Sequence, residues 1–152
     1  MAKDPSKELA IELTKVFCAT FKLYYLTHSC HWCVIGTPFY SVHLMLEEQY
    51  KEMFTAIDDI AEKIRQLDAN PPSQLSFVDI HSPSYEDCSK QEIQAMTYSL
   101  AQSQTSIIDV LKVAIDLCKK YQREDLVNYL ASRWEAHSKM RWMLRATSGK
   151  ID

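Results

Sequence analysis

The sequence predicts an all-α protein folded as a four-helix bundle, and three observations support this prediction. Four long segments place apolar residues at spacings of three and four, which is the pattern of a helix with one buried face. Only two glycines occur in 152 residues, whereas an all-β chain of this length needs many turn glycines. With 47% hydrophobic and 24% charged residues, the composition is globular, and the length suits one domain that spans residues 1–152.

The first helix is expected over residues 6–34 and the second over residues 40–67. Between them Gly36 and Pro38 interrupt the pattern, because a residue that precedes proline disfavours the helical conformation. The second helix ends at the Asn-Pro-Pro-Ser segment of residues 70–73. The residues expected to face the core are Leu9, Leu13, Val16, Phe17, Phe21, Tyr24 and Tyr25 in the first helix, and Leu46, Tyr50, Met53, Phe54, Ile57, Ala61 and Ile64 in the second.

A linker rich in serine and proline follows over residues 71–90, with a short helix expected over residues 75–80. The third helix is expected over residues 91–121. The fourth is expected over residues 124–146, with acidic residues at its start that suit a helix N-terminus. Short loops make each pair of neighbouring helices an antiparallel hairpin, and the long linker can cross the bundle. A four-helix bundle with one long crossover, here carrying a short helix, is the ferritin-like arrangement.

Charge and apolar patterning narrow the class of function. The net charge of −3 at pH 7 argues against a protein whose whole surface binds nucleic acid. No run approaches 18 consecutive apolar residues, so we expect no transmembrane helix and no membrane partner. The polar first residues lack a signal-peptide core, so a cytoplasmic protein is expected. The five cysteines are odd in number and unevenly spaced, so free thiols are expected.

Five side chains that can bind metal gather on and just before the second helix. They are His31, His43, Glu47, Asp58 and Glu62. His43 and Glu47 are four residues apart, and so are Asp58 and Glu62, so each pair shares a helical face. Such groups are rarely buried without a partner or a metal, and carboxylates with imidazole suit iron, manganese or zinc. The alternative is a solvated face with incidental ion pairs.

Helix geometry constrains how these residues could form one site. His43 and Asp58 are fifteen residues apart, which is roughly 22 Å along a helix axis at about 1.5 Å per residue. One straight helix therefore cannot bring both side chains to one metal ion. If all five belong to one site, two chains must supply it, with their second helices antiparallel about a two-fold axis, and the dimer carries two identical sites.

The sequence around these residues resembles the Dps family, the mini-ferritins. Residues 27–36, Thr-His-Ser-Cys-His-Trp-Cys-Val-Ile-Gly, are similar to the T-H-x-x-H-W-x-V-x-G signature of that family. The match continues at Phe39, His43, Glu47, Asp58, Ala61, Glu62, Lys63 and Ile64, and again from His137 to Arg145. The His-Trp pair, the histidine twelve residues later and the Asp-x-x-x-Glu pair together make this resemblance specific. It spans most of the chain.

The resemblance implies a ferroxidase that stores iron. Members of the family form a hollow dodecamer, oxidise Fe(II) at di-iron sites between subunits and keep the ferric mineral inside, which protects against oxidative stress. Hydrogen peroxide is the expected oxidant, and dioxygen is the alternative. On the family pattern His31, His43 and Glu47 come from one subunit, and Asp58 and Glu62 come from its two-fold mate. The competing function is a DNA-binding protein that protects the nucleoid and has a secondary metal site.

Two further features near the signature allow more than one interpretation. Trp32 matches the family tryptophan beside the site, where it is the candidate catalytic residue that takes up oxidising equivalents; the alternative is packing under the helix end. Cys30 and Cys33 form a Cys-x-x-Cys pair that departs from the family and could be a redox motif or a zinc clip. The pair ends a helix, whereas thioredoxin-type motifs start one, so we expect packing thiols. A thiol redox protein is the third functional alternative.

We expect no stable complex with duplex DNA at roughly 150 mM salt, although DNA binding is the activity for which the family is named. The first eight residues oppose Lys3 and Lys7 with Asp4 and Glu8, so this tail offers little net charge. Affinity from phosphate neutralisation falls with salt at a log–log slope of about −0.9 per contact. A gel shift at neutral pH measures the outcome. A shifted band that disappears on deletion of residues 1–7 would contradict this prediction.

Overall fold

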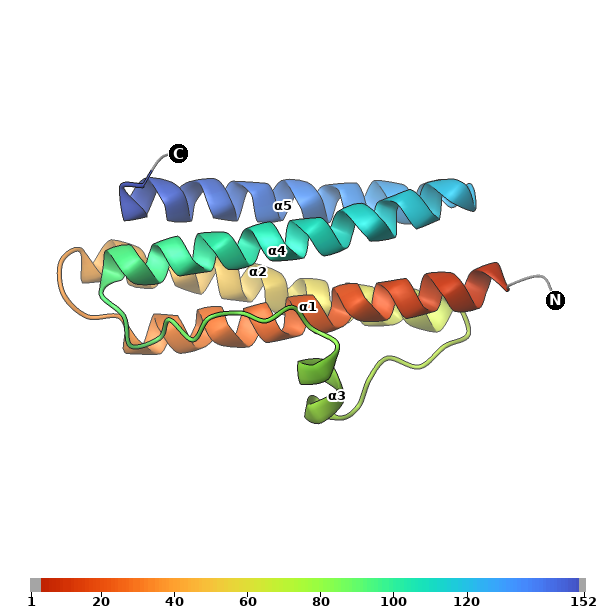
Figure 1. The fold of residues 1–152 in the computed structure, drawn as a ribbon, viewed down its shortest axis with the longest axis horizontal. Coiled ribbons are helices and arrows are strands. Elements are labelled where there is room, and N and C mark those ends of the chain that lie inside the picture. Colours follow the sequence, from red (N-terminus) through yellow and green to blue (C-terminus); the bar gives the residue numbers. More distant parts are fainter. Residues whose placement is uncertain (1–3, 151–152) are drawn as a thin grey trace.

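The computed structural model describes residues 4–150, and within this range the chain forms five helices and no strand. They are α1 (Pro5–Cys33), α2 (Phe39–Gln66), α3 (Leu75–Ile80), α4 (Ile93–Lys120) and α5 (Glu124–Ser148). The four long helices lie side by side, and the short α3 stands outside the bundle next to α1 (Figure 1). The predicted bundle with a short helix in its crossover is confirmed. Every helix begins and ends within two residues of its expected bounds.

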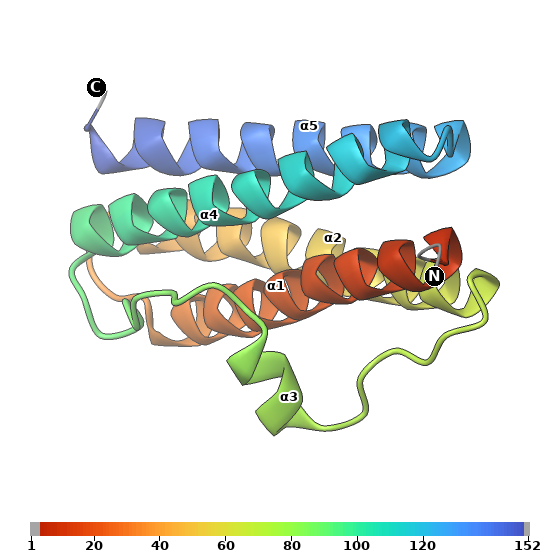
Figure 2. The same ribbon diagram turned by 45° about the vertical axis from the view of Figure 1, so that its right-hand side comes forward.

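The crossover of residues 67–92 carries the chain from one end of the bundle to the other along α1 (Figures 1 and 2). The hydroxyl of Ser82 donates to the carbonyl of Cys18 at 2.8 Å, and that of Tyr85 donates to the carbonyl of Ala19 at 3.1 Å. Burial raises the pKa of Tyr85, so its phenol stays protonated and can donate. These two bonds hold the second half of the crossover against α1.

Local sequence explains where the long helices begin and end. The side chain of Asp4 accepts a hydrogen bond from the backbone N–H of Ser6 at 3.0 Å, and Pro5 occupies the first turn of α1. The loop between α1 and α2 contains Gly36 at φ +95°, a left-handed conformation that favours glycine. The last helix ends at Gly149, whose φ of +70° is the usual C-terminal stop. The chain therefore turns back where the sequence predicts a break.

The core consists of two apolar clusters, one toward each end of the bundle. One is built around residues such as Leu13, Ile60 and Leu111, and the other around residues such as Leu46 and Leu100. The sequence pattern placed Tyr25 and Phe54 in the core, but their side chains are 59% and 62% exposed, so these two predictions were wrong. Helical spacing identifies an apolar face and does not say which neighbour covers it.

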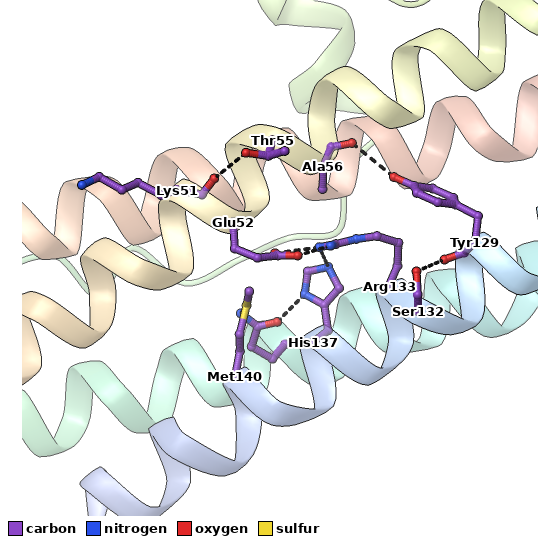
Figure 3. Close-up of polar contacts among 10 residues, drawn as sticks. Lys51, Glu52, Thr55, Ala56, Tyr129, Ser132, Arg133, His137 and Met140 are labelled. Carbon is purple, nitrogen blue, oxygen red and sulfur yellow. Dashed lines mark hydrogen bonds and ion pairs between the residues drawn. The ribbon is translucent and has the colours of Figure 1, made fainter.

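A buried polar network lies between the two apolar clusters, where α2, α4 and α5 meet (Figure 3). Arg133 of α5 forms a two-pronged ion pair with the carboxylate of Glu52 of α2. Arg133 also donates to Nε2 of His137 at 3.3 Å, and Nδ1–H of His137 donates to the amide oxygen of Gln104 at 2.6 Å. Arg133, His137 and Gln104 are buried, and a slip of one helix past another would leave them without their partners, so the network fixes the register of three helices.

His137 is neutral in this network, because its Nε2 accepts a hydrogen bond while its Nδ1–H donates one. Its side chain is completely buried. Burial, and next the positive charge of Arg133, lower the pKa of His137 to about 3.

We predict that His137 makes the folded protein less stable as the pH falls from about 6.5 toward 3. In this range the unfolded chain, whose histidine titrates near 6.5, binds a proton that the folded chain does not bind. The free energy of unfolding should therefore fall by at most about 1.4 kcal/mol per pH unit within this range. Above pH 6.5 neither state binds the proton, so His137 causes no loss of stability there.

Urea unfolding at a fixed protein concentration, measured at several pH values, tests the prediction. A His137→Gln variant, which cannot take up the proton, should show a shallower loss of stability on acidification. The matched control is His81→Gln, because His81 is exposed and should leave the wild-type slope unchanged. Equal slopes for wild type and His137→Gln would contradict the prediction.

Candidate metal centre

The end of α1 and the first turns of α2 bring the imidazoles of His31 and His43 together. The rings stack with their centroids 3.8 Å apart and an angle of 17° between their planes. Nδ1 of each ring lies 2.9 Å from the backbone carbonyl oxygen of the other residue. A carbonyl can only accept, so each Nδ1 carries the proton and donates. This leaves the lone pair on Nε2 of both rings free to bind a metal ion.

The position of each histidine in its helix explains this reciprocal bonding. The carbonyl of His31 is among the last four of α1, which have no partner within their own helix. His43 lies in the second turn of α2 and supplies the missing donor across the short loop. His31 is 8% exposed and His43 is half-buried, so the pair opens toward the surface on one side.

Glu47 completes the cluster, because it lies one helical turn after His43. One ligand atom from each of His31, His43 and Glu47 lies within 4.8 Å of the others. In the part of the chain that the structure describes, no other group of three such residues comes this close. Two imidazole nitrogens and one carboxylate that leave coordination positions open are the donor set of non-haem Fe(II) sites. The residues present therefore fit an iron ion.

The carboxylate of Glu47 is paired with the ammonium of Lys51, one further turn along α2. The hydrogen bond and positive charge of Lys51 lower the pKa of Glu47, with smaller contributions from His31 and His43. The carboxylate is therefore anionic near neutral pH and ready to bind a cation. A metal ion must compete with Lys51 for it.

Asp58 and Glu62 do not join this cluster within one chain. Both side chains are exposed, and Asp58 lies about 16 Å beyond Glu47 along the axis of α2 at about 1.5 Å per residue. Asp58 borders a surface hollow of about 440 Å³ that is also lined by Phe54 and Ile57. The predicted ligands thus fall into two groups, and the second group lies beside uncovered apolar surface.

Aromatic rings connect Trp32 with the histidine pair. The His28 ring lies 4.0 Å from the Trp32 ring and stacks on the Tyr50 ring at 3.8 Å, measured between centroids. Tyr50 in turn meets His31 edge-on at 5.1 Å. Trp32 is 59% exposed in the single chain, and intervening rings connect it to the cluster. Sequence reasoning assigned Tyr50 to the core. Its position two turns after His43 could have indicated a place beside the cluster.

The two cysteines of the Cys-x-x-Cys pair point in different directions. Cys30 is buried, and its Sγ lies 3.6 Å from Sγ of Cys88, whereas Cys33 is exposed. The contact with Cys88, and next burial, raise the pKa of Cys30 well above its ordinary value, so it stays a thiol. No cysteine takes part in a close group of three metal-ligating residues within residues 4–150. The structure therefore does not assemble the zinc clip that the sequence left open.

A four-helix bundle with one long crossover and metal-binding side chains on facing helices defines a ferritin-like protein. The model of the ferritin-like domain family matches residues 12–152 of this chain. General stress protein 20U of Bacillus subtilis (strain 168) is 28% identical over 144 residues, which cover 95% of this chain and 99% of that protein. The DNA protection during starvation protein of Brevibacillus brevis is 28% identical over 142 residues, which cover 91% of this chain and 93% of that protein.

Solved structures show the same likeness. A crystal structure of a Dps protein from Bacillus brevis superposes with a TM-score of 0.89 at 25% identity, covering 96% of this chain and 98% of that one. The chain therefore belongs to the ferritin-like family and, within it, to the Dps proteins. None of the helices in the described residues combines the length and apolar character that crossing a membrane requires.

We predict that a Lys51→Met variant binds a divalent ion about threefold more tightly than the wild type, because removal of an exposed ion-pair partner frees the Glu47 carboxylate. A His31→Ala variant should bind at least about tenfold more weakly, because it loses a ligand. Calorimetric titration with Co²⁺ measures both. The matched control is Lys112→Met, which removes the same charge from the ion pair with Asp109 on α4. Equal affinities for the two lysine variants would show that Lys51 does not compete.

Proposed function

We propose that this protein is a mini-ferritin with ferroxidase activity. It takes up Fe(II) as its substrate, oxidises it at di-iron sites shared between subunits and stores the ferric mineral in a dodecameric shell, which protects the cell against oxidative stress. The observation that carries this proposal is the cluster of His31, His43 and Glu47, in which both Nε2 atoms are left free by the reciprocal hydrogen bonds. We also propose a cytoplasmic location, where the five thiols stay reduced.

The second half of each site would come from Asp58 and Glu62 of a two-fold related subunit. Three features support this arrangement. The distance along α2 forbids a site within one chain, both carboxylates are exposed, and Phe54 beside them is 62% exposed. An uncovered aromatic side chain next to a surface hollow is typical of a face that another chain covers. Two antiparallel α2 helices would place the carboxylates of each chain opposite the histidines of the other.

The arrangement suits oxidation by two electrons. Two Fe(II) ions supply two electrons to one hydrogen peroxide molecule, which takes up two protons and becomes two water molecules, and no hydroxyl radical is released. Carboxylates are hard anions and stabilise Fe(III) more than Fe(II). Dioxygen is the alternative oxidant. Trp32 lies outside the cluster and would act as a sink for oxidising equivalents, with His28 and Tyr50 as the rings between them.

The related proteins support the proposal of iron storage and protection in general terms. The Dps protein of Vibrio cholerae O1 is described as a member of a broad superfamily of ferritin-like diiron-carboxylate proteins, and it is 22% identical to this chain. The relative from Brevibacillus brevis is named for DNA protection during starvation. We propose that the protective role of this chain comes from the removal of Fe(II) and peroxide, without a requirement for contact with DNA.

Mixed assembly of two inactive variants tests the shared site. One variant, His31→Ala with His43→Ala, lacks the histidine half. The other, Asp58→Ala with Glu62→Ala, lacks the carboxylate half. A mixed dimer contains one complete site and one empty site, so activity should return when the two variants are dissociated and reassembled together. The readout is the absorbance of ferric product after anaerobic loading with Fe(II), followed by peroxide and, in a parallel sample, by air.

The control is each variant reassembled alone, which should stay inactive while forming a shell of normal size by light scattering. Proven mixing without recovered activity would place the site within one subunit. A monomer with full ferroxidase activity would contradict the shared site as well.

A further inference from the structure

Cys30 and Cys88 face each other inside the bundle, where the end of α1 meets the last part of the crossover. Their Sγ atoms are 3.6 Å apart, both side chains are 0% exposed, and both are free thiols. They are separated by 58 residues of sequence, so no local spacing brings them together. The proposed ferroxidase chemistry uses neither thiol.

The contact is one of three interactions that hold the crossover against α1. Ser82, Tyr85 and Cys88 follow one another at intervals of three residues, and each contacts α1. Ser82 and Tyr85 donate hydrogen bonds to backbone carbonyls of α1, and Cys88 contacts the thiol of Cys30. Residues 83–88 have no regular secondary structure. This part of the crossover can therefore shift by the small distance that separates a contact at 3.6 Å from a bond of about 2.05 Å.

We propose that Cys30 and Cys88 are a redox-active dithiol, which hydrogen peroxide converts into a disulfide that locks the crossover onto α1. When the crossover opens and water reaches the pair, one thiol loses its proton, and the thiolate attacks peroxide, breaks its O–O bond and becomes a sulfenic acid. The hydroxide that is released takes up that proton and leaves as one water molecule. The second thiol then displaces the sulfenic oxygen as another water molecule, and the S–S bond forms. The dithiol loses two electrons and two protons, and peroxide gains them. A thiol reductant reverses the reaction by exchange.

The surface next to the pair offers a route for a small neutral oxidant. A hollow of about 260 Å³ is lined by the exposed Cys33 and by residues 89–92, which directly follow Cys88 in the chain. Opening of this segment exposes the pair without unfolding of the helices. The reaction needs no metal ion, so its outcome is independent of the function proposed above.

In the test, metal-free protein is treated with hydrogen peroxide, and the remaining thiols are then alkylated under denaturing conditions. Mass spectrometry of the whole chain gives the number of blocked thiols. The number of blocked thiols should fall from five to three per chain. Trypsin should release peptides 23–51 and 66–90 joined to each other, because Cys30 lies in the first and Cys88 in the second. Chymotryptic cleavage after Trp32 separates Cys30 from Cys33 and should leave the link on Cys30.

Matched variants distinguish this pair from the other thiols. Cys33→Ser and Cys118→Ser should still lose two thiols on oxidation, whereas Cys88→Ser, which can form at most a sulfenic acid at Cys30, should lose at most one thiol and form no link. Dithiothreitol should restore the full count in the wild type. A link through Cys33, an equal loss of thiols in Cys88→Ser, or five blocked thiols after peroxide treatment would each overturn the proposal. The peptide map of the wild type decides the matter even where a variant does not fold.

Discussion

The reciprocal hydrogen bonds between His31 and His43 are the constraint on which the rest of the site depends. Each imidazole uses its Nδ1–H to bind the backbone carbonyl of the other residue, so the two bonds settle the tautomer of each ring and tie the end of α1 to the start of α2. One ligand atom of each imidazole lies within 4.8 Å of a carboxylate oxygen of Glu47. Replacement of either histidine would remove a candidate metal ligand and also leave a carbonyl without its partner.

The second helix, α2, connects this site to the rest of the bundle. Leu46, Met53 and Ile60 face the apolar core, Glu52 joins the polar network with Arg133, and Phe54 remains uncovered. The network sits between the two apolar clusters and fixes the register of α2 against α4 and α5 (Figure 3). A rigid α2 holds the ligand cluster near its start and the exposed carboxylates farther along at a fixed separation, as a site shared between two copies would require.

Much of this architecture could be predicted from sequence, because helical periodicity and helix-breaking residues act locally. The breaks at Gly36 and Pro38 and the long linker gave the order of the elements. Spacing also grouped His43 with Glu47. The exposure of Phe54 and the contact between Cys30 and Cys88 could not be predicted in this way. Both depend on which surfaces meet in three dimensions, and neither an apolar pattern nor a count of cysteines predicts those tertiary contacts.

The placement of the crossover has a consequence for how the chain folds. The α1–α2 and α4–α5 pairs are each joined by a short loop, so their packing is local in sequence, and only the crossover separates the two pairs (Figure 1). Local contacts form faster than distant ones, because less chain entropy is lost when a short loop closes. Each helical pair can thus form early, and the first can form while the ribosome is still making the second. We therefore expect the docking of the two helical pairs, with the crossover laid along α1, to be the slow step of folding.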